Sequence, residues 1–219
     1  MAAEIVTGQG RDDLHLVVAQ SNIQSCRSFL VSHSAGERDV PPPNEKAPVT
    51  LLTAQPSSFK EFTLALQESF SVAAIAEFGH PLDEPIPSDD DVAHSLSAPG
   101  SVAHWIMANG ERVGGAVVSV DEKSRRNTLS FFFVSTNQQS RGLGLRAWQA
   151  IEKAYPSTRV WETVTPYFEK RNIHFYVNKC GFKIVEFYNK SNPDPHHQPS
   201  LNLGEEGSDE MFKFEKNME

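Results

Sequence analysis

A short glycine-bearing turn is the part of the sequence best suited to bind a phosphate. Residues 139–144 read Gln-Ser-Arg-Gly-Leu-Gly and join an apolar stretch, 129–134, to a helix-like segment, 145–155. Glycines allow a ligand to approach the main chain closely, and the N–H groups at the start of a helix attract anions. The spacing predicts a strand, a turn and a helix that together hold a phosphate or pyrophosphate.

Two common nucleotide-binding motifs are excluded by the residues after this turn. A P-loop needs Gly-Lys-Ser/Thr, but Gly144 is followed by Leu145 and Arg146, which supply neither the lysine nor the magnesium-binding hydroxyl. The dinucleotide fingerprint needs a third glycine, which is also missing. The alternative to a phosphate site is an ordinary helix start after a buried strand.

Three linked features of the chain resemble the GNAT superfamily of acyl-CoA-dependent N-acyltransferases. They are Val134 at the end of a strand, the turn at 139–144, and a distal segment, 171–182, that carries an asparagine and ends in Cys-Gly-Phe. The resemblance covers roughly residue 48 to the C-terminus. It implies an α/β (α+β) fold, with a mixed, mostly antiparallel sheet flanked by helices and splayed between its fourth and fifth strands.

The resemblance also implies acetyl-CoA as co-substrate. The main chain of the fourth strand would pair with the pantetheine arm like an added strand, and the turn would hold the pyrophosphate, with Arg141 adding charge. The alternative for Arg141 is a solvated surface role, and for Asn172 a helix-start cap. The expected cofactor-binding residues are Phe132, Phe133, Val134, Gln139, Ser140, Arg141, Gly142, Leu143, Gly144, Leu145 and Asn172.

For catalysis the resemblance implies direct attack by a primary amine on the acetyl group in a ternary complex. Tyr176 corresponds to the phenol that protonates the departing thiolate, but it stands five residues before Gly181, where four is usual in the family. On a regular helix this offset turns the phenol by about 100°, towards the core, unless the helix is adjusted. Tyr167 and an ordered water are the alternatives.

Glu162 is the first candidate for the base that receives the amine proton, because it lies on the expected fifth strand beside the split. His174 and Glu169 come next, although a histidine on a helix is more often structural or exposed. The main-chain N–H of Val134 would stabilise the oxyanion. We expect no covalent enzyme intermediate.

An acidic segment, 80–91, lies in the part of the chain that overhangs the acceptor site in the family. It could select a cationic amine such as a polyamine, an aminoglycoside or a peptide amino end, and the alternative is a solvated charge run. Its acidic residues are Asp83, Glu84, Asp89, Asp90 and Asp91.

Composition narrows the class of protein further. The 219 residues, 39% of them apolar, suffice for one substantial core, and a formal charge of −8 argues against nucleic acid or an anionic membrane as partner. The two cysteines are far apart, no secretory signal or membrane span is evident, and we expect a cytoplasmic protein without a disulfide. His196 and His197 lie in a proline-rich loop without matching ligands, so no metal is expected.

The expected organisation is an N-terminal extension with a proline-rich linker, 1–46, followed by an N-acetyltransferase domain, 47–219. Within the extension, 14–19 could form a short strand and 23–30 a small helix. Helices are expected from a capping box at 58–61, near Ser88, at 145–155 and at 169–180. Strands are expected at 49–53, 102–107, 113–120, 129–134, 159–165, 182–187 and 211–215.

Two classes of function remain. The first is an acetyl-CoA-dependent N-acetyltransferase that acts on a small-molecule or peptide amine, either as a monomer or as a homodimer. The second is a non-catalytic acyl-CoA-binding regulatory module, whose N-terminal extension contacts a partner.

Overall fold

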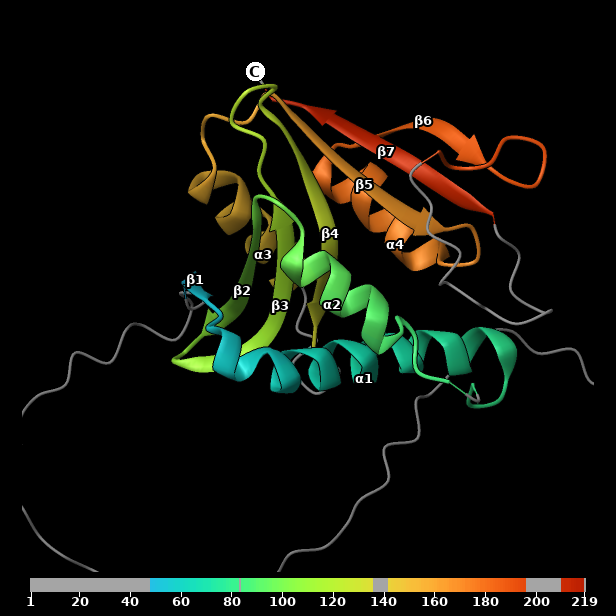
Figure 1. Cartoon of the computed structure of the whole chain (residues 1–219), viewed down its shortest axis with the longest axis horizontal. Helices are drawn as coiled ribbons and strands as arrows, with labels where there is room; N and C mark the ends of the chain where they lie inside the picture. The colour runs from blue at the N-terminus through green and yellow to red at the C-terminus, as the bar shows by residue number, and fades with distance from the viewer. Residues whose placement is uncertain (1–47, 83, 136–141, 196–209, 219) are drawn as a thin grey trace, which may run out of the picture. The chain divides into compact units, whose positions relative to one another are not determined.

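A computed structural model describes residues 48–82, 84–135, 142–195 and 210–218. These residues belong to one compact unit, Asn44–Glu219. Its strands form one sheet in the order β1-β2-β3-β4-β5-β7-β6, antiparallel throughout except between β4 and β5 (Figure 1). The strands are β1 Val49–Thr53, β2 Ser101–Ala108, β3 Glu111–Ser119, β4 Arg126–Val134, β5 Val160–Pro166, β6 Lys183–Tyr188 and β7 Met211–Asn217.

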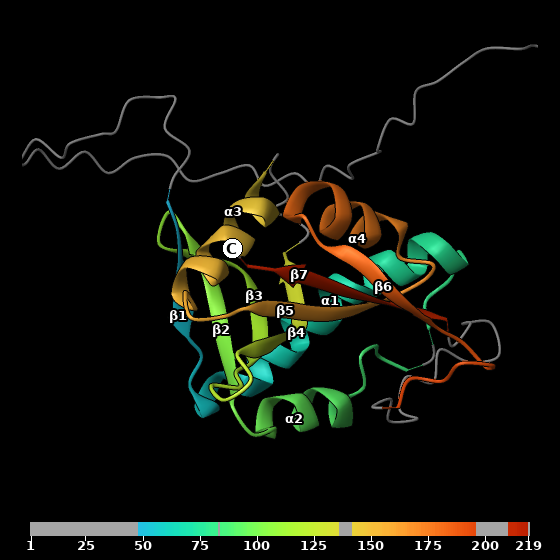
Figure 2. The same cartoon turned by 90° about the horizontal axis from the view of Figure 1, so that it is seen from above.

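Helices cover both faces of this sheet. They are η1 Pro56–Ser58, α1 Phe59–Phe78, α2 Asp89–Ser97, α3 Leu143–Ala154 and α4 Lys170–His174, which continues as the π-helix η3 Phe175–Cys180. Figure 2 shows α3 and α4 on one side of the sheet and α2 on the other. The mixed, mostly antiparallel sheet with flanking helices confirms the predicted fold class.

Adjacent residues of β3 show how the two faces divide the core. Val117 packs with Phe62 and Leu66 of α1, whereas its neighbours Ala116 and Val118 belong to a second cluster. Successive side chains of a strand point to opposite faces, so the two clusters lie on opposite sides of the sheet. The second cluster includes Leu129, Trp148, Ile151, Trp161, Tyr176, Phe182 and Phe214.

The strands expected at 102–107, 113–120 and 129–134 are present as β2, β3 and β4, which form an antiparallel meander. The β2–β3 turn uses Asn109 and Gly110, with φ of 54° and 80°, as a two-residue hairpin requires. In the β3–β4 turn, Asp121 accepts hydrogen bonds from the N–H groups of Lys123 and Ser124. β4 begins earlier than expected, at Arg126, because its first residues pair with β5.

The capping box expected at 58–61 is wrong. Ser58 is the N-cap of α1, but its hydroxyl donates to Gln55 O at 2.8 Å and caps no helical N–H. Glu61 forms an ion pair with Arg112 instead. A box of this kind does occur at α2, where Ser88 Oγ accepts from Asp91 N–H and Asp91 accepts from Ser88 N–H, so the helix expected near Ser88 is confirmed.

The split between the fourth and fifth strands is confirmed. β4 and β5 pair only at Arg126 with Val160, Asn127 with Trp161, and Thr128 with Glu162. Beyond these positions the two strands diverge, as Figure 1 shows. Along the rest of its length, each of the two strands has an edge without a partner strand among the described residues.

Several sequence-based expectations lie outside the described residues. They concern the segments at 14–19 and 23–30, Cys26, Asp83, His196 and His197. Among the described helices, none has the length and apolar character needed to cross a membrane.

Candidate acyl-transfer site

The main-chain edge of β4 that faces the split belongs to Phe132 and Val134. The N–H of Ser135, directly after β4, donates to Val113 O of β3 at 2.9 Å, so Ser135 and Val113 are a hydrogen-bonded pair. Bonded and non-bonded pairs alternate along an antiparallel ladder, so the N–H and C=O of Val134 and Phe132 point away from β3. The main chain of Phe133 faces β3 instead.

A β-bulge at Ser130 sets this orientation. The register passes from Val117–Phe131 to Val118–Leu129, which leaves Ser130 without an opposite residue on β3. Leu129 accordingly lies in the core cluster under α3, whereas Phe131 packs against the cluster under α1. Bulges redirect side chains in this way and are frequent beside active sites.

The helix after β4 begins without a side-chain cap. Gly142 is the N-cap of α3 and has a φ of 87°, a left-handed conformation that glycine adopts at little cost. The first turn holds no acidic residue. Leu143 is buried, Leu145 is half-buried, and a Cβ at Gly144 would lie 3.3 Å from the ring of Phe175. Gln139, Ser140 and Arg141 lie outside the described residues.

The one-residue offset of Tyr176 has a structural counterpart. The helix expected at 169–180 is α-helical only to His174 and continues as a π-helix to Cys180. The N–H of Gly181 donates to Tyr176 O, five residues back, as in a π-turn. A π-turn holds one residue more than an α-turn, which accommodates the extra residue between Tyr176 and Gly181, and the side chain of Tyr176 lies in the core cluster under α3.

Tyr176 is buried close to the start of the split. Its ring contacts those of Phe182 and Phe214, with centroids 5.5 and 5.6 Å away. Burial raises the pKa of Tyr176 above its usual value, and a hydrogen bond with Thr163 on β5 opposes that rise. Burial also raises the pKa of Cys180 to about 12, which makes this thiol a poor nucleophile.

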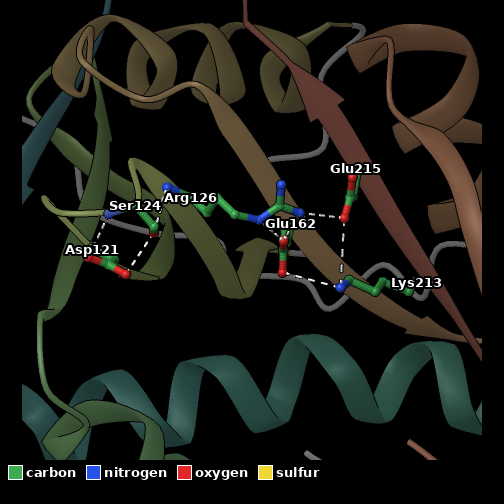
Figure 3. Close-up of polar contacts among 6 residues, drawn as sticks. All are labelled: Asp121, Ser124, Arg126, Glu162, Lys213 and Glu215. Carbon is green, nitrogen blue, oxygen red and sulfur yellow. Dashed lines mark hydrogen bonds and ion pairs between the residues drawn. The ribbon is translucent and has the colours of Figure 1, made fainter.

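Glu162 lies in a cluster of four charges, with Arg126, Lys213 and Glu215 (Figure 3). Arg126 Nε donates to Glu162 Oε1 at 2.7 Å, and its Nη2 bonds both carboxylates. Lys213 Nζ lies 3.4 Å from Glu162 Oε2. The hydrogen bond with Glu162 is the main cause of the raised pKa of Arg126. Sequence reasoning found Glu162 but neither cation, since they come from other strands.

Tyr176 and Glu162 approach the split from opposite faces of the sheet. Trp161 and Tyr176 both belong to the cluster that packs under α3. Glu162 follows Trp161 on β5, so its side chain points to the other face. The two side chains therefore lie on opposite sides of the sheet.

The remaining candidates are less well placed or have other contacts. His174 is exposed and lies 2.9 Å from the Asn178 amide, and Tyr167 is 43% exposed against Phe212. Asn172 lies inside α4, whose N-cap is Glu169, so a helix-start cap is wrong for Asn172.

The acidic segment takes part in local structure. Asp89 accepts a hydrogen bond from Gln67 at 2.8 Å, and Asp91 belongs to the capping box of α2. Asp90 also lies in the first turn of that helix, where acidic residues are favourable. Within the described part of the chain, no group of three or more His, Cys, Asp or Glu residues could hold a metal ion.

The parted sheet and the uncapped start of α3 together define the class of acetyltransferases with the GNAT fold. The sequence profile of the acetyltransferase (GNAT) family matches residues 65–182. The chain belongs to this family and is therefore an acyltransferase. A protein of Bacillus subtilis (strain 168), YrkN, is 50% identical over 178 residues, which cover 78% of this chain and 94% of YrkN.

Solved structures show the same fold at low sequence identity. The ribosomal-protein-S18-alanine N-acetyltransferase from Escherichia coli is 13% identical, with a TM-score of 0.54 over 77% of this chain and 93% of its own. An acetyltransferase of Bacillus subtilis in complex with CoA is 17% identical, with a TM-score of 0.53 over 80% and 100%. An acetyltransferase from Thermus thermophilus is 18% identical, with a TM-score of 0.55 over 78% and 97%.

Proposed function

We propose that the protein is an acetyl-CoA-dependent N-acetyltransferase that moves the acetyl group to a primary amine by direct attack in a ternary complex. The observation that carries this proposal is the parting of β4 from β5 after Thr128, which exposes the main-chain edge of β4 beside the start of α3. Family membership and the CoA complex of the Bacillus subtilis structure support CoA as the carrier.

The donor would lie along β4 with its phosphates at α3. The outward main-chain groups of Phe132 and Val134 would bond the pantetheine arm as an added strand does. The N–H groups that follow Gly142 would bind the pyrophosphate, because Gly142 as the N-cap has no side chain to cap them. Arg141 and Asn172 would add contacts to the cofactor.

The chemistry would proceed in one complex. The amine nitrogen bonds the acetyl carbonyl carbon, and Glu162, which lies at the paired end of the split, receives the proton of the amine through water molecules. The N–H of Val134 stabilises the oxyanion. The carbon–sulfur bond then breaks, and Tyr176 gives its proton to the thiolate. Free CoA and the acetylated amine leave the site.

The charge cluster bears on how Glu162 could act. Arg126 occupies Oε1 with two hydrogen bonds, whereas Lys213 reaches Oε2 only at 3.4 Å. Oε2 is therefore the freer oxygen and the one we assign to the amine proton. Arg126 would hold the carboxylate in place while this happens.

Three further proposals concern the whole chain. Residues 47–219 form the catalytic domain, residues 1–46 are an extension to it, and the protein works in the cytoplasm. A homodimer is compatible with all of them.

Thiol release from acetyl-CoA tests the function across a panel of polyamines, aminoglycosides, amino acids and peptides. We expect release that depends on one class of amine, with a matching gain of about 42 Da in that amine, as one acetyl group replaces one hydrogen. Calorimetry with acetyl-CoA should show binding in the same buffer. Binding without release for every amine would favour the regulatory module, and no binding would contradict both classes.

A further inference from the structure

We propose that Phe175 is a positioning residue of the CoA site, because its ring joins the π-helix η3 to the first turn of α3 and to β4. This role rests on the proposed function, since it concerns the same site. Gly144 then has a role other than the expected contact with the phosphates: its missing side chain makes room for the Phe175 ring. Phe175 was not among the residues expected from the sequence.

The ring of Phe175 lies against the main chain of α3. A Cβ placed on Gly144 would lie 3.3 Å from Cε2 and 3.5 Å from Cζ of this ring. Carbon atoms normally pack at about 3.5–4.0 Å, so an alanine at this position would push against the ring. Gly144 lies within the α-helix and is not one of the glycines with a positive φ, so its backbone conformation does not require glycine. The close approach of Phe175 does.

The same ring stacks on a phenylalanine of β4. The rings of Phe175 and Phe132 are nearly parallel, with 10° between their planes and centroids 5.7 Å apart. Aromatic pairs at such a separation stabilise beyond the area that they bury. The main chain of Phe132 lies on the edge of β4 that faces the split, so the stack lies beside the edge assigned to the pantetheine arm.

Phe175 therefore joins three parts of the proposed site. It belongs to η3, directly before Tyr176, and it contacts both Gly144 of α3 and Phe132 of β4. The helices α3 and α4, the second of which continues as η3, lie on the same side of the sheet (Figure 2). A ring packed on α3 and on β4 restrains η3 relative to both. It thus sets the spacing between the phosphate end of the site, at α3, and the acid, Tyr176.

The first test asks whether Phe175 is the reason for glycine at position 144, and it needs no ligand. Alanine in place of a helical glycine normally stabilises a protein, because it reduces the freedom of the unfolded chain. Urea unfolding would compare Gly144→Ala with the wild type, and the double variant Gly144→Ala/Phe175→Leu with Phe175→Leu. Leucine lacks the two ring atoms that the alanine would meet.

We expect Gly144→Ala to give no gain in the urea midpoint of the wild type, because the Phe175 ring opposes it. In the Phe175→Leu background the same substitution should raise the midpoint by about 0.3 M, the ordinary gain at a helical position. Equal shifts in the two backgrounds would overturn the packing of Phe175 on Gly144 as the reason for the glycine.

The second test measures the affinity for acetyl-CoA by calorimetry. Phe70→Leu is the matched control for Phe175→Leu, because each substitution removes a partly buried ring that contacts a phenylalanine of β4. Phe70 of α1 meets Phe131, the neighbour of Phe132, on the other face of the sheet, with centroids 6.4 Å apart. We expect acetyl-CoA to bind about tenfold more weakly to Phe175→Leu and with wild-type affinity to Phe70→Leu.

Wild-type affinity in Phe175→Leu, or an equal loss in Phe70→Leu, would overturn the positioning role. If the wild-type protein itself binds no acetyl-CoA, the proposed function fails. The urea midpoints would still decide in that case whether the Phe175 ring holds the start of α3.

Discussion

Arg126 on β4 and Glu162 on β5 are joined by two hydrogen bonds that end on the same carboxylate oxygen. The pair spans the last stretch over which the two strands remain paired. Glu215 on β7 accepts a hydrogen bond from Nη2 of the same guanidinium, at 2.5 Å. Glu162 and Glu215 both form ion pairs with Arg126 and Lys213. Glu162 lies on β5 beside the split, whereas Glu215 lies on the neighbouring strand β7, so Glu215 is a matched control for Glu162.

Glu162→Gln should lower kcat by about a hundredfold, because an amide cannot take up the amine proton. Glu215→Gln removes the equivalent charge from the cluster and should leave most of the rate. Initial rates at saturating acetyl-CoA measure both variants. Similar losses in the two would mean that the cluster acts only as a structural unit.

Tyr176→Phe should lower kcat by about a hundredfold or more while acetyl-CoA binds with unchanged affinity, because only the proton donor is lost. Tyr167→Phe is the control, since Tyr167 is the other tyrosine considered as the acid and is largely exposed. Calorimetry and turnover are measured on the same samples. An active Tyr176→Phe variant would assign proton transfer to water or to Tyr167.

Gly142→Ala should weaken acetyl-CoA binding and lower the free energy of unfolding by about 1 kcal/mol, because alanine is strained at a φ of 87°. Gly79→Ala is the control: Gly79 ends α1 with a φ of 77°, and a Cβ there would meet nothing within 4 Å. Both variants should lose similar stability, but only Gly142→Ala should lose affinity. Unchanged affinity in Gly142→Ala would argue against a phosphate site at α3.

His104 should make folding stability depend on pH below neutrality. It is buried on β2 with Nε2 2.5 Å from the Tyr155 hydroxyl, and its Nδ1 has no hydrogen-bond partner among the described residues. Burial lowers the pKa of His104 from 6.5, so the folded state resists the proton that the unfolded state accepts. Stability from this residue is therefore present above pH 6.5 and falls as the pH drops below it, by at most about 1.4 kcal/mol per unit.

Urea unfolding at pH 7.5 and pH 5.5, about one unit on either side of the histidine pKa, measures this dependence. The loss of stability on acidification should be smaller in His104→Gln than in the wild type. His94→Gln, at an exposed position on α2, should keep the wild-type loss. Equal losses in all three proteins would show that His104 does not carry the effect.

Most of the strands could be predicted because their burial follows the sequence pattern. Val113, Val117 and Leu129 lie in runs of apolar residues that only a sheet covered on both faces accommodates. Gly110 and Gly142 both stand at turns and both have a positive φ, a conformation that glycine adopts at little cost. Local chemistry alone sufficed for these features.

The less predictable features depend on contacts between distant segments. No local pattern distinguishes a π-helix at 175–180 from an α-helix, and Tyr176 within it packs against Phe214, which lies far along the chain. The bulge at Ser130 depends on the register with β3, and the hydrogen bond from Thr163 to Leu129 O depends on where two strands part. The capping box expected at Ser58 also fails through a contact with a distant segment, because Glu61 forms a hydrogen bond with Arg112 of β3.

Initial rates over a matrix of acetyl-CoA and amine concentrations test direct transfer most directly. A ternary complex predicts double-reciprocal lines that intersect, because both substrates must be bound before the acetyl group moves. Parallel lines, together with release of CoA in the absence of amine, would indicate a covalent acetyl-enzyme and contradict the account.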